Sequence, residues 1–214
     1  MSQKKRDIGD LELLGGRLCL DFVNTVEWRG TESPYDFLNT YRNFVIWCRH
    51  VGLMRNPEAK VLIQKADKNP AEAKKILFRA LELRETIYRL FSSMSEGISP
   101  AKKDLAAFNK YLSQTMRESR IIETKEGLTW DSEGNKDSLA WILNPVIRSA
   151  ADLLVSGDLK RVKSCADSSC GWLFLDISRN KSRRWCDMKD CGNRAKASRF
   201  YRRRKLSRAG PSPS

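Results

Sequence analysis

The spacing of hydrophobic residues predicts that most of the first 159 residues are helical. The clearest segment is 70–95, where apolar residues recur at intervals of three and four and form one stripe. Asn69 is placed to cap this helix, Pro70 suits its first position, and Glu72 completes a capping-box pattern. The same periodicity predicts four further helices, at 35–51, 57–67, 99–116 and about 137–156.

Two of these helices carry more detailed expectations. In the helix at 99–116, four apolar residues share one face and are expected to point into the core: Leu105, Phe108, Leu112 and Met116. In the helix at 137–156, Pro145 is expected to produce a kink, because proline has no backbone N–H to donate. Gly157 is a natural end for that helix.

Shorter alternating segments predict a small amount of strand. Residues 17–23 alternate between apolar and polar side chains after a Gly-Gly pair, which predicts a short strand. Residues 120–124 and 128–131 alternate on either side of 125–127, which predicts a β-hairpin. The expected fold class is therefore α+β, mainly α: a helical N-terminal domain with a small hairpin, followed by a C-terminal module.

The net charge is unevenly distributed along the chain. Its 214 residues carry 40 Lys and Arg against 26 Asp and Glu, a formal charge of +14. Residues 160–208 hold sixteen of the basic residues and four acidic ones, so this end carries nearly all of the excess. Such asymmetry indicates a polyanionic partner. Because 41% of the residues are hydrophobic and none form a membrane-length run, we expect a folded, cytoplasmic protein.

Four of the six cysteines are grouped within the basic end. Cys165 and Cys170 are separated by four residues, and Cys186 and Cys191 repeat that spacing fifteen residues later. Two thiolate pairs at this separation can close a tetrahedral shell around one structural zinc ion, which leaves no open position for catalytic water. Zinc is favoured over an iron–sulfur cluster.

The order of parts around these cysteines predicts a treble-clef-like zinc fold at 160–206. The first pair is followed by an apolar run at 172–175 and then by a polar, basic turn at 178–181. The second pair opens a segment with no Pro or Gly after Gly192, as expected of a helix whose first N–H groups favour thiolate charge. Another kind of four-cysteine knuckle is the alternative. Residues 207–214 are expected to be a disordered tail.

The helix that follows Cys191 is expected to bind nucleic acid. Its apolar residues are expected to pack against Trp172 and Phe174 of the module; they are Ala197, Phe200 and Tyr201. Its basic residues fall on another side, where Arg can read guanine and Lys can neutralise phosphate in a major groove. The candidate DNA-binding residues are Lys181, Arg183, Arg184, Arg194, Lys196, Arg199, Arg202, Arg203, Arg204 and Lys205. RNA, or an acidic protein partner, stays open as an alternative.

Two segments resemble known bacterial families. Residues 186–194 read CDMKDCGNR and follow FLD at 174–176 and SRRW at 182–185, which closely resembles the CGNR zinc-finger family. Residues 16–25 read GRLCLDFVNT, with a later Trp47 and Gly52-Leu53, which is similar to the ABATE domain that usually precedes this finger. The resemblance implies a stress-associated bacterial transcription regulator. Its finger would bind DNA, and its N-terminal domain would sense or bind something.

No pattern in the sequence identifies a catalytic site, so we expect that the protein is not an enzyme. It has no GxSxG, no HExxH and no glycine-rich phosphate loop, and its single histidine, His50, has no partner nearby in the sequence. Asn24, Thr25 and Arg29 follow the predicted strand and could line a small-molecule pocket, with Trp28 or Trp47 as its apolar wall. The competing interpretation, that Asn24 and Thr25 cap the next element, is somewhat favoured.

Four other residues in the N-terminal domain have simpler expectations. Cys19 and Cys48 stand alone in apolar surroundings and are expected to be buried small hydrophobes. Asp21 and Glu27 could act as acid or base only if the small-molecule pocket exists.

Two classes of function therefore stay open. The first is a zinc-dependent DNA-binding regulator whose N-terminal domain, 1–159, senses a small molecule or mediates assembly. The second is a small-molecule-binding or enzymatic domain that carries the finger as an RNA- or ribosome-targeting tail. A homodimer is a further expectation, because one small finger reads a short site with little specificity. The helix at 70–95 is a candidate interface, although core packing explains its stripe better.

Overall fold

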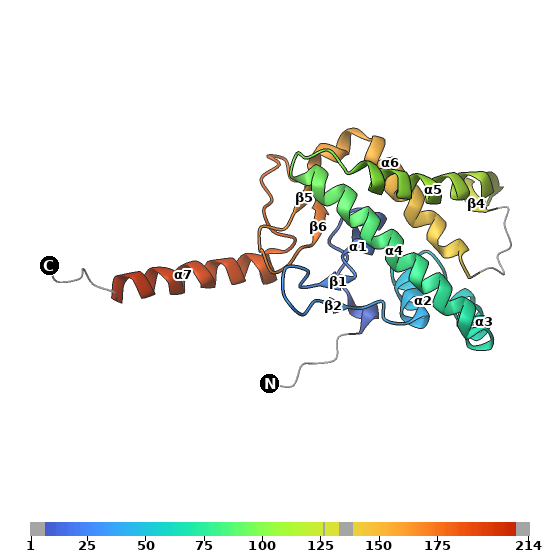
Figure 1. The fold of residues 1–214 in the computed structure, drawn as a ribbon, viewed down its shortest axis with the longest axis horizontal. Coiled ribbons are helices and arrows are strands. Elements are labelled where there is room, and N and C mark those ends of the chain that lie inside the picture. The colour runs from blue at the N-terminus through green and yellow to red at the C-terminus, as the bar shows by residue number, and fades with distance from the viewer. Residues whose placement is uncertain (1–6, 126, 133–138, 209–214) are drawn as a thin grey trace.

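A computed structural model describes residues 7–125, 127–132 and 139–208, which form a helical body and one projecting helix (Figure 1). The helices are η1 (Ile8–Asp10), α1 (Leu18–Val23), α2 (Tyr41–His50), α3 (Asn56–Lys68), α4 (Pro70–Ser95), α5 (Lys102–Glu118), η2 (Trp141–Leu143), α6 (Asn144–Val155), η3 (Gly157–Arg161), η4 (Met188–Gly192) and α7 (Asn193–Arg208). Three antiparallel pairs join β1 (Val26–Glu27) to β2 (Tyr35–Asp36), β3 (Ser119–Thr124) to β4 (Gly127–Ser132), and β5 (Val162–Ser164) to β6 (Leu173–Leu175). None of these described helices is long and apolar enough to cross a membrane.

The long helix α4 is the centre of the body, as its apolar stripe predicts. The Asn69 side chain caps it by accepting the backbone N–H of Glu72, and Pro70 is its first residue. Its stripe is buried from Ala73 to Phe91, and α1, α2, α3 and α5 pack around it (Figure 1). The stripe is therefore part of the core.

Two other predicted elements are confirmed with small changes of boundary. The helix expected at 57–67 is α3, and the expected hairpin is β3–β4. The helix expected at 35–51 begins only at Tyr41, because the Thr40 side chain accepts the N–H of Asn43 and caps it there. Gly52 has a φ of +79° just after this helix, so the predicted stop is in place.

The strand predicted at 17–23 is wrong, because Leu18–Val23 forms helix α1. The Asp21 carboxylate accepts the N–H of Gly15 at 2.8 Å across the first turn. Four of the six α1 side chains are completely buried: Cys19, Leu20, Phe22 and Val23. A helix this short and this buried is apolar on most sides, so its sequence also fits an alternating pattern.

Predictions for α5 and α6 hold only in part. Phe108 is buried as expected, but Leu105 is 41% exposed and Met116 is 48% exposed. Pro145 does not kink a helix; it lies in the first turn of α6, after the separate η2. At this position its missing N–H costs no hydrogen bond, so it starts the helix. Residues 137 and 138 of the predicted helix lie outside the described residues.

The C-terminal module packs directly on the helical body. Strand β5 lies against α4, and β6 lies against α1 and α4. The buried Asn24 amide donates to the carbonyl of Leu173 at 2.8 Å and accepts its N–H at 2.9 Å. The Trp172 indole N–H donates to the carbonyl of Val26 at 2.9 Å. These buried hydrogen bonds join segments almost 150 residues apart into one structure.

Helix α7 projects away from the body (Figure 1). The predicted packing of its apolar residues on the module is wrong, because Phe200 is 60% exposed and Tyr201 is 67% exposed. Ala197 is exposed as well. The helix continues to Arg208, so the first two residues of the predicted tail are helical, and 209–214 lie outside the described residues.

Candidate metal centre

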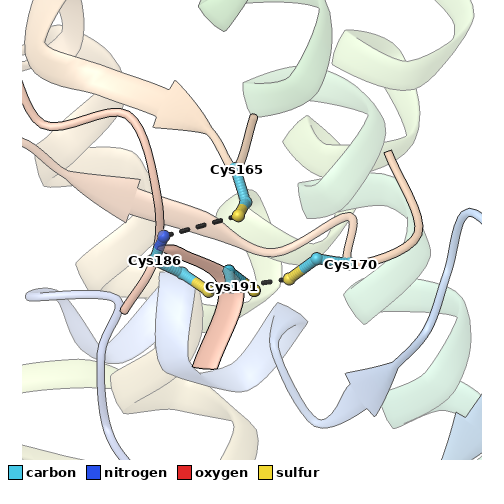
Figure 2. A group of neighbouring side chains, drawn as sticks. All are labelled: Cys165, Cys170, Cys186 and Cys191. Carbon is cyan, nitrogen blue, oxygen red and sulfur yellow. Dashed lines mark hydrogen bonds between the residues drawn. The ribbon is translucent and has the colours of Figure 1, made fainter. Parts of the chain in front are cut away.

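The four C-terminal cysteines meet at one point, where their side chains face one another (Figure 2). Their sulfur atoms all lie within 4.8 Å of one another, and all four residues are buried. Cys165 follows β5, Cys170 precedes β6, Cys186 lies in the next loop, and Cys191 lies in η4 just before α7. Four sulfur donors at this separation fit the tetrahedral shell of one structural zinc ion.

The first cysteine pair is held by a tight turn between β5 and β6. The Asp167 carboxylate accepts the backbone N–H and the hydroxyl of Ser169, and the N–H of Cys170 donates to the carbonyl of Asp167. Gly171 then turns the chain with a φ of +72°, and the N–H of Cys165 donates to the Trp172 carbonyl. The first cysteine pair thus lies between the two strands of the β5–β6 hairpin. The sequence had suggested that the hairpin comes after this pair.

In the second pair, Cys191 lies at the start of α7, as predicted, whereas Cys186 lies in the loop before η4. The Asp187 carboxylate accepts the N–H groups of Lys189 and Asp190 and caps η4, which contains Cys191. The guanidinium of Arg194 donates to the sulfur of Cys191 at 3.1 Å and pairs with Asp167 at 2.7 Å. One arginine therefore joins both halves of the metal centre and offsets part of the negative charge of bound thiolates.

Hydrogen bonds among the cysteines favour the thiolate form of one of them, Cys165. Side-chain contacts from Cys170 and Cys186 lower the pKa of the Cys165 thiol, and the backbone N–H of Cys186 adds a further donor at 3.4 Å. Contacts with neighbouring thiols and burial raise the pKa of the other three, Cys170, Cys186 and Cys191. Because zinc binds the deprotonated sulfur, these three thiols would release their protons when the metal binds.

Asp176 supports the module, and the sequence analysis did not select it. Its side chain is completely buried and accepts hydrogen bonds from Lys163, Ser178 and the N–H of Arg183. Burial would raise the pKa of this carboxyl, but the bonds from Lys163 and Ser178 lower it overall, so Asp176 stays ionised. An acidic residue directly after a buried apolar strand carried only a weak signal of this role.

The candidate DNA-binding residues separate into two groups. Arg183 donates to the carbonyls of Trp185 and Cys186 and lies over the Phe174 ring, and Arg194 is bound at the metal centre, so both also hold the module together. The others whose side chains the structure describes are exposed; they are Lys181, Arg184, Lys196, Arg199, Arg203 and Arg204. Arg202 and Lys205 also lie within α7.

The structure places the four candidate ligand-binding residues in packing and hydrogen-bonding roles. Asn24 joins α1 to β6, and the completely buried Thr25 donates to the carbonyl of Phe22. Arg29 pairs with Glu85 of α4 at 2.7 Å. Trp47 is completely buried, with its ring 5.2 Å from that of Phe22. The competing expectation, that Asn24 and Thr25 cap the next element, is not met either, because Asn24 bonds to β6 and Thr25 bonds back to α1.

Four other singled-out residues, Cys19, Asp21, Cys48 and His50, lie in helices α1 and α2. Cys19 and Cys48 are completely buried, which confirms the prediction, and burial raises the pKa of Cys19 to about 12. The His50 ring contacts the carbonyl of Leu11 at 2.7 Å. Burial raises the pKa of Asp21 to about 6, against the opposing effect of the Gly15 N–H.

A buried four-cysteine cluster at the base of a basic helix defines a structural zinc protein of the finger class. Two family models match the chain. ABATE, described as "Putative stress-induced transcription regulator", matches residues 16–157, and the CGNR zinc finger matches residues 161–204. The chain belongs to the ABATE family and carries a C-terminal CGNR zinc finger. A search of curated proteins found no match.

Proposed function

We propose that this protein is a zinc-dependent DNA-binding transcription regulator whose N-terminal domain senses a small molecule. The observation that carries the proposal is α7: an exposed basic helix with no acidic residue from 196 to 208, fixed at its first turn by the metal centre. Its 16 residues span about 24 Å, enough to lie along a major groove. The family description supports a regulator.

The geometry of α7 suits DNA because its free end is far from the body. Lys196, Arg199 and Arg203 are exposed and follow one another at helical spacing. The guanidinium of Arg199 lies 6.0 Å from the Trp185 ring, beside the metal centre, while Arg203 lies one turn further out. In this proposal the first turns of α7 contact the phosphates and base edges, and the zinc ion has a structural, non-catalytic role.

A second candidate is RNA or single-stranded nucleic acid. Phe200 and Tyr201 are exposed on the same helix, with their rings 5.8 Å apart. Exposed aromatic rings beside arginines can stack on unpaired bases, which duplex DNA does not offer. This observation favours RNA targeting over loose binding to any polyanion.

The proposal is tested by selecting bound fragments from a random duplex library with the zinc-loaded protein. The selection is made at about 150 mM salt, which suppresses simple charge attraction. We expect an enriched sequence motif, and a palindromic motif would indicate a homodimer. A parallel selection from a random single-stranded RNA library serves as the comparison. Enrichment only from the RNA library would replace DNA by RNA, and enrichment from neither would reduce α7 to a general polyanion anchor.

A further inference from the structure

A cavity of about 360 Å³ lies between the N-terminal segment and the metal centre. Residues 7–14 form one side of it, and the chain around β1 and β2 forms another. The third side is the zinc module, because Cys170, Cys186 and Cys191 line the same space. This volume accommodates a small organic molecule. Of the residues that the sequence associated with a small-molecule pocket, Glu27 and Trp28 line this cavity, whereas Asn24, Thr25, Arg29 and Trp47 do not.

The charge lining this cavity is opposite in sign to that of the whole chain. Six acidic residues line it: Asp7, Asp10, Glu12, Glu27, Asp187 and Asp190. Arg194 is the one basic residue in that lining, and its guanidinium is already paired with Asp167 at 2.7 Å. A zinc ion bound by four thiolates would add negative charge beside the same space. In a chain of net charge +14, this cavity is therefore a local site for a cation.

The apolar lining of the cavity supplies aromatic walls. Trp28, Phe37 and Trp172 line it together with Leu11 and Leu14. The Trp172 ring is held in place by its bond to the carbonyl of Val26, and the Trp28 ring already lies 4.5 Å below the Arg194 guanidinium. Aromatic faces attract cations, and their area binds a flat apolar body.

We propose that this cavity binds a small organic cation, an amine or guanidine carried on an apolar body. The carboxylates would bind the charged group and the aromatic walls the body. Because Arg194 is in the first turn of α7 and Trp28 is in the N-terminal domain, an occupant would touch both parts of the Trp28–Arg194 contact. Any effect on DNA binding rests on the proposed function, but binding in the cavity does not.

Isothermal titration calorimetry of the zinc-loaded full chain tests this proposal without DNA. The probes are tryptamine, benzylamine and spermidine, and indole-3-acetate is the anionic counterpart of tryptamine. We expect saturable binding of tryptamine and none of indole-3-acetate. The double variant Asp10→Asn/Glu12→Gln should weaken tryptamine binding about threefold to tenfold, because each exposed charge contributes modestly. The matched control Asp67→Asn/Glu123→Gln removes the same charge elsewhere and should leave binding unchanged.

Lys4, Lys5 and Arg6 directly precede Asp7 in the sequence and are cations of the chain itself. The titration is therefore repeated on the full-length variant Lys4→Gln/Lys5→Gln/Arg6→Gln, which removes these competing cations. The proposal is overturned if none of the three amines binds either chain, if indole-3-acetate binds as well as tryptamine, or if both double variants weaken binding equally. Because the titration contains no DNA, each of these outcomes can be interpreted even if the DNA selection fails.

Discussion

Single residues decide how the N-terminal domain and the zinc module meet. Gly30 is one of them: a Cβ atom at this position would lie 1.7 Å from the carbonyl oxygen of Ser168, in the turn that carries the first cysteine pair. The neighbouring backbone already bonds to that turn, because the N–H of Arg29 donates to the carbonyl of Cys170 at 3.2 Å. No side chain fits between these two backbones.

Gly30→Ala should therefore destabilise the whole protein, by about 1–3 kcal/mol for an overpacked contact between two backbones. The free energy of unfolding in urea measures it. Gly157→Ala is the matched control, since a Cβ atom there meets nothing within 4 Å. Equal stability of the two variants would contradict the close contact between the turn and the loop after β1.

Asp21 gives a pH-dependent prediction. Burial raises the pKa of this carboxyl from 3.8 to about 6, so the folded state binds its proton more tightly than the unfolded chain does. The stabilisation by that proton is fully present below pH 4 and is lost as the pH rises through 6. Asp21→Asn has no such proton to lose, and its amide oxygen can still accept the N–H of Gly15.

The stability of Asp21→Asn relative to the natural chain should therefore rise by about 1–3 kcal/mol between pH 4 and pH 7. Urea unfolding of both proteins across this range measures the difference. Asp67→Asn is the control, because Asp67 is 63% exposed. If the stability difference between Asp21→Asn and the natural chain did not change from pH 4 to pH 7, the pKa of Asp21 would not be raised and the prediction would be wrong.

At the scale of elements, the sequence predicted those that are defined by local signals. The helix at 70–95 has a cap, an N-terminal proline and a long stripe, and these signals act together on neighbouring residues. The hairpin at 119–132 likewise follows from local alternation around a turn. The cysteine spacing predicted the metal centre because two cysteine pairs at that separation are typical ligands of one structural zinc ion.

Elements defined by distant contacts escaped prediction. The segment 17–23 is helical because α4, α6 and β6 surround it, and six residues carry too little periodicity to show that. Phe200 and Tyr201 suggested a packed face, but α7 leaves the body before they could reach it. The acidic cavity beside the metal centre joins residues 7–14 to residues beyond 170, and no sequence pattern connects them.

At the scale of the whole molecule, the helical body and the β5–β6 hairpin form one packed unit, from which α7 projects. The β5–β6 hairpin lies against α4, and Asn24 bonds to the backbone of β6 within the core. The β5–β6 part of the zinc module is thus packed on the helical body and not joined to it only by a linker. A change at the metal centre should reach the helical body through these buried contacts.

Cys186→Ser tests this connection. We expect loss of the zinc ion, loss of the near-UV circular dichroism of Trp172 and Trp185, and a lower Tm for the helical signal as well. Cys19→Ala, which changes a cysteine outside the cluster, should retain one zinc ion per chain. A helical transition unchanged by Cys186→Ser would mean that the body folds independently of the module.

The most direct test of the central claim, that α7 binds DNA through its exposed basic side chains, is the salt dependence of DNA affinity. Arg199→Ala/Arg203→Ala should weaken duplex binding and reduce the slope of log K against log salt by about 1.8, since each lost phosphate contact contributes about 0.9. Zinc content should not change. The control Arg42→Ala/Arg117→Ala removes the same charge from the body and should leave the slope nearly unchanged. Equal slopes for the natural chain and the α7 variant would place the DNA contact elsewhere and contradict the account.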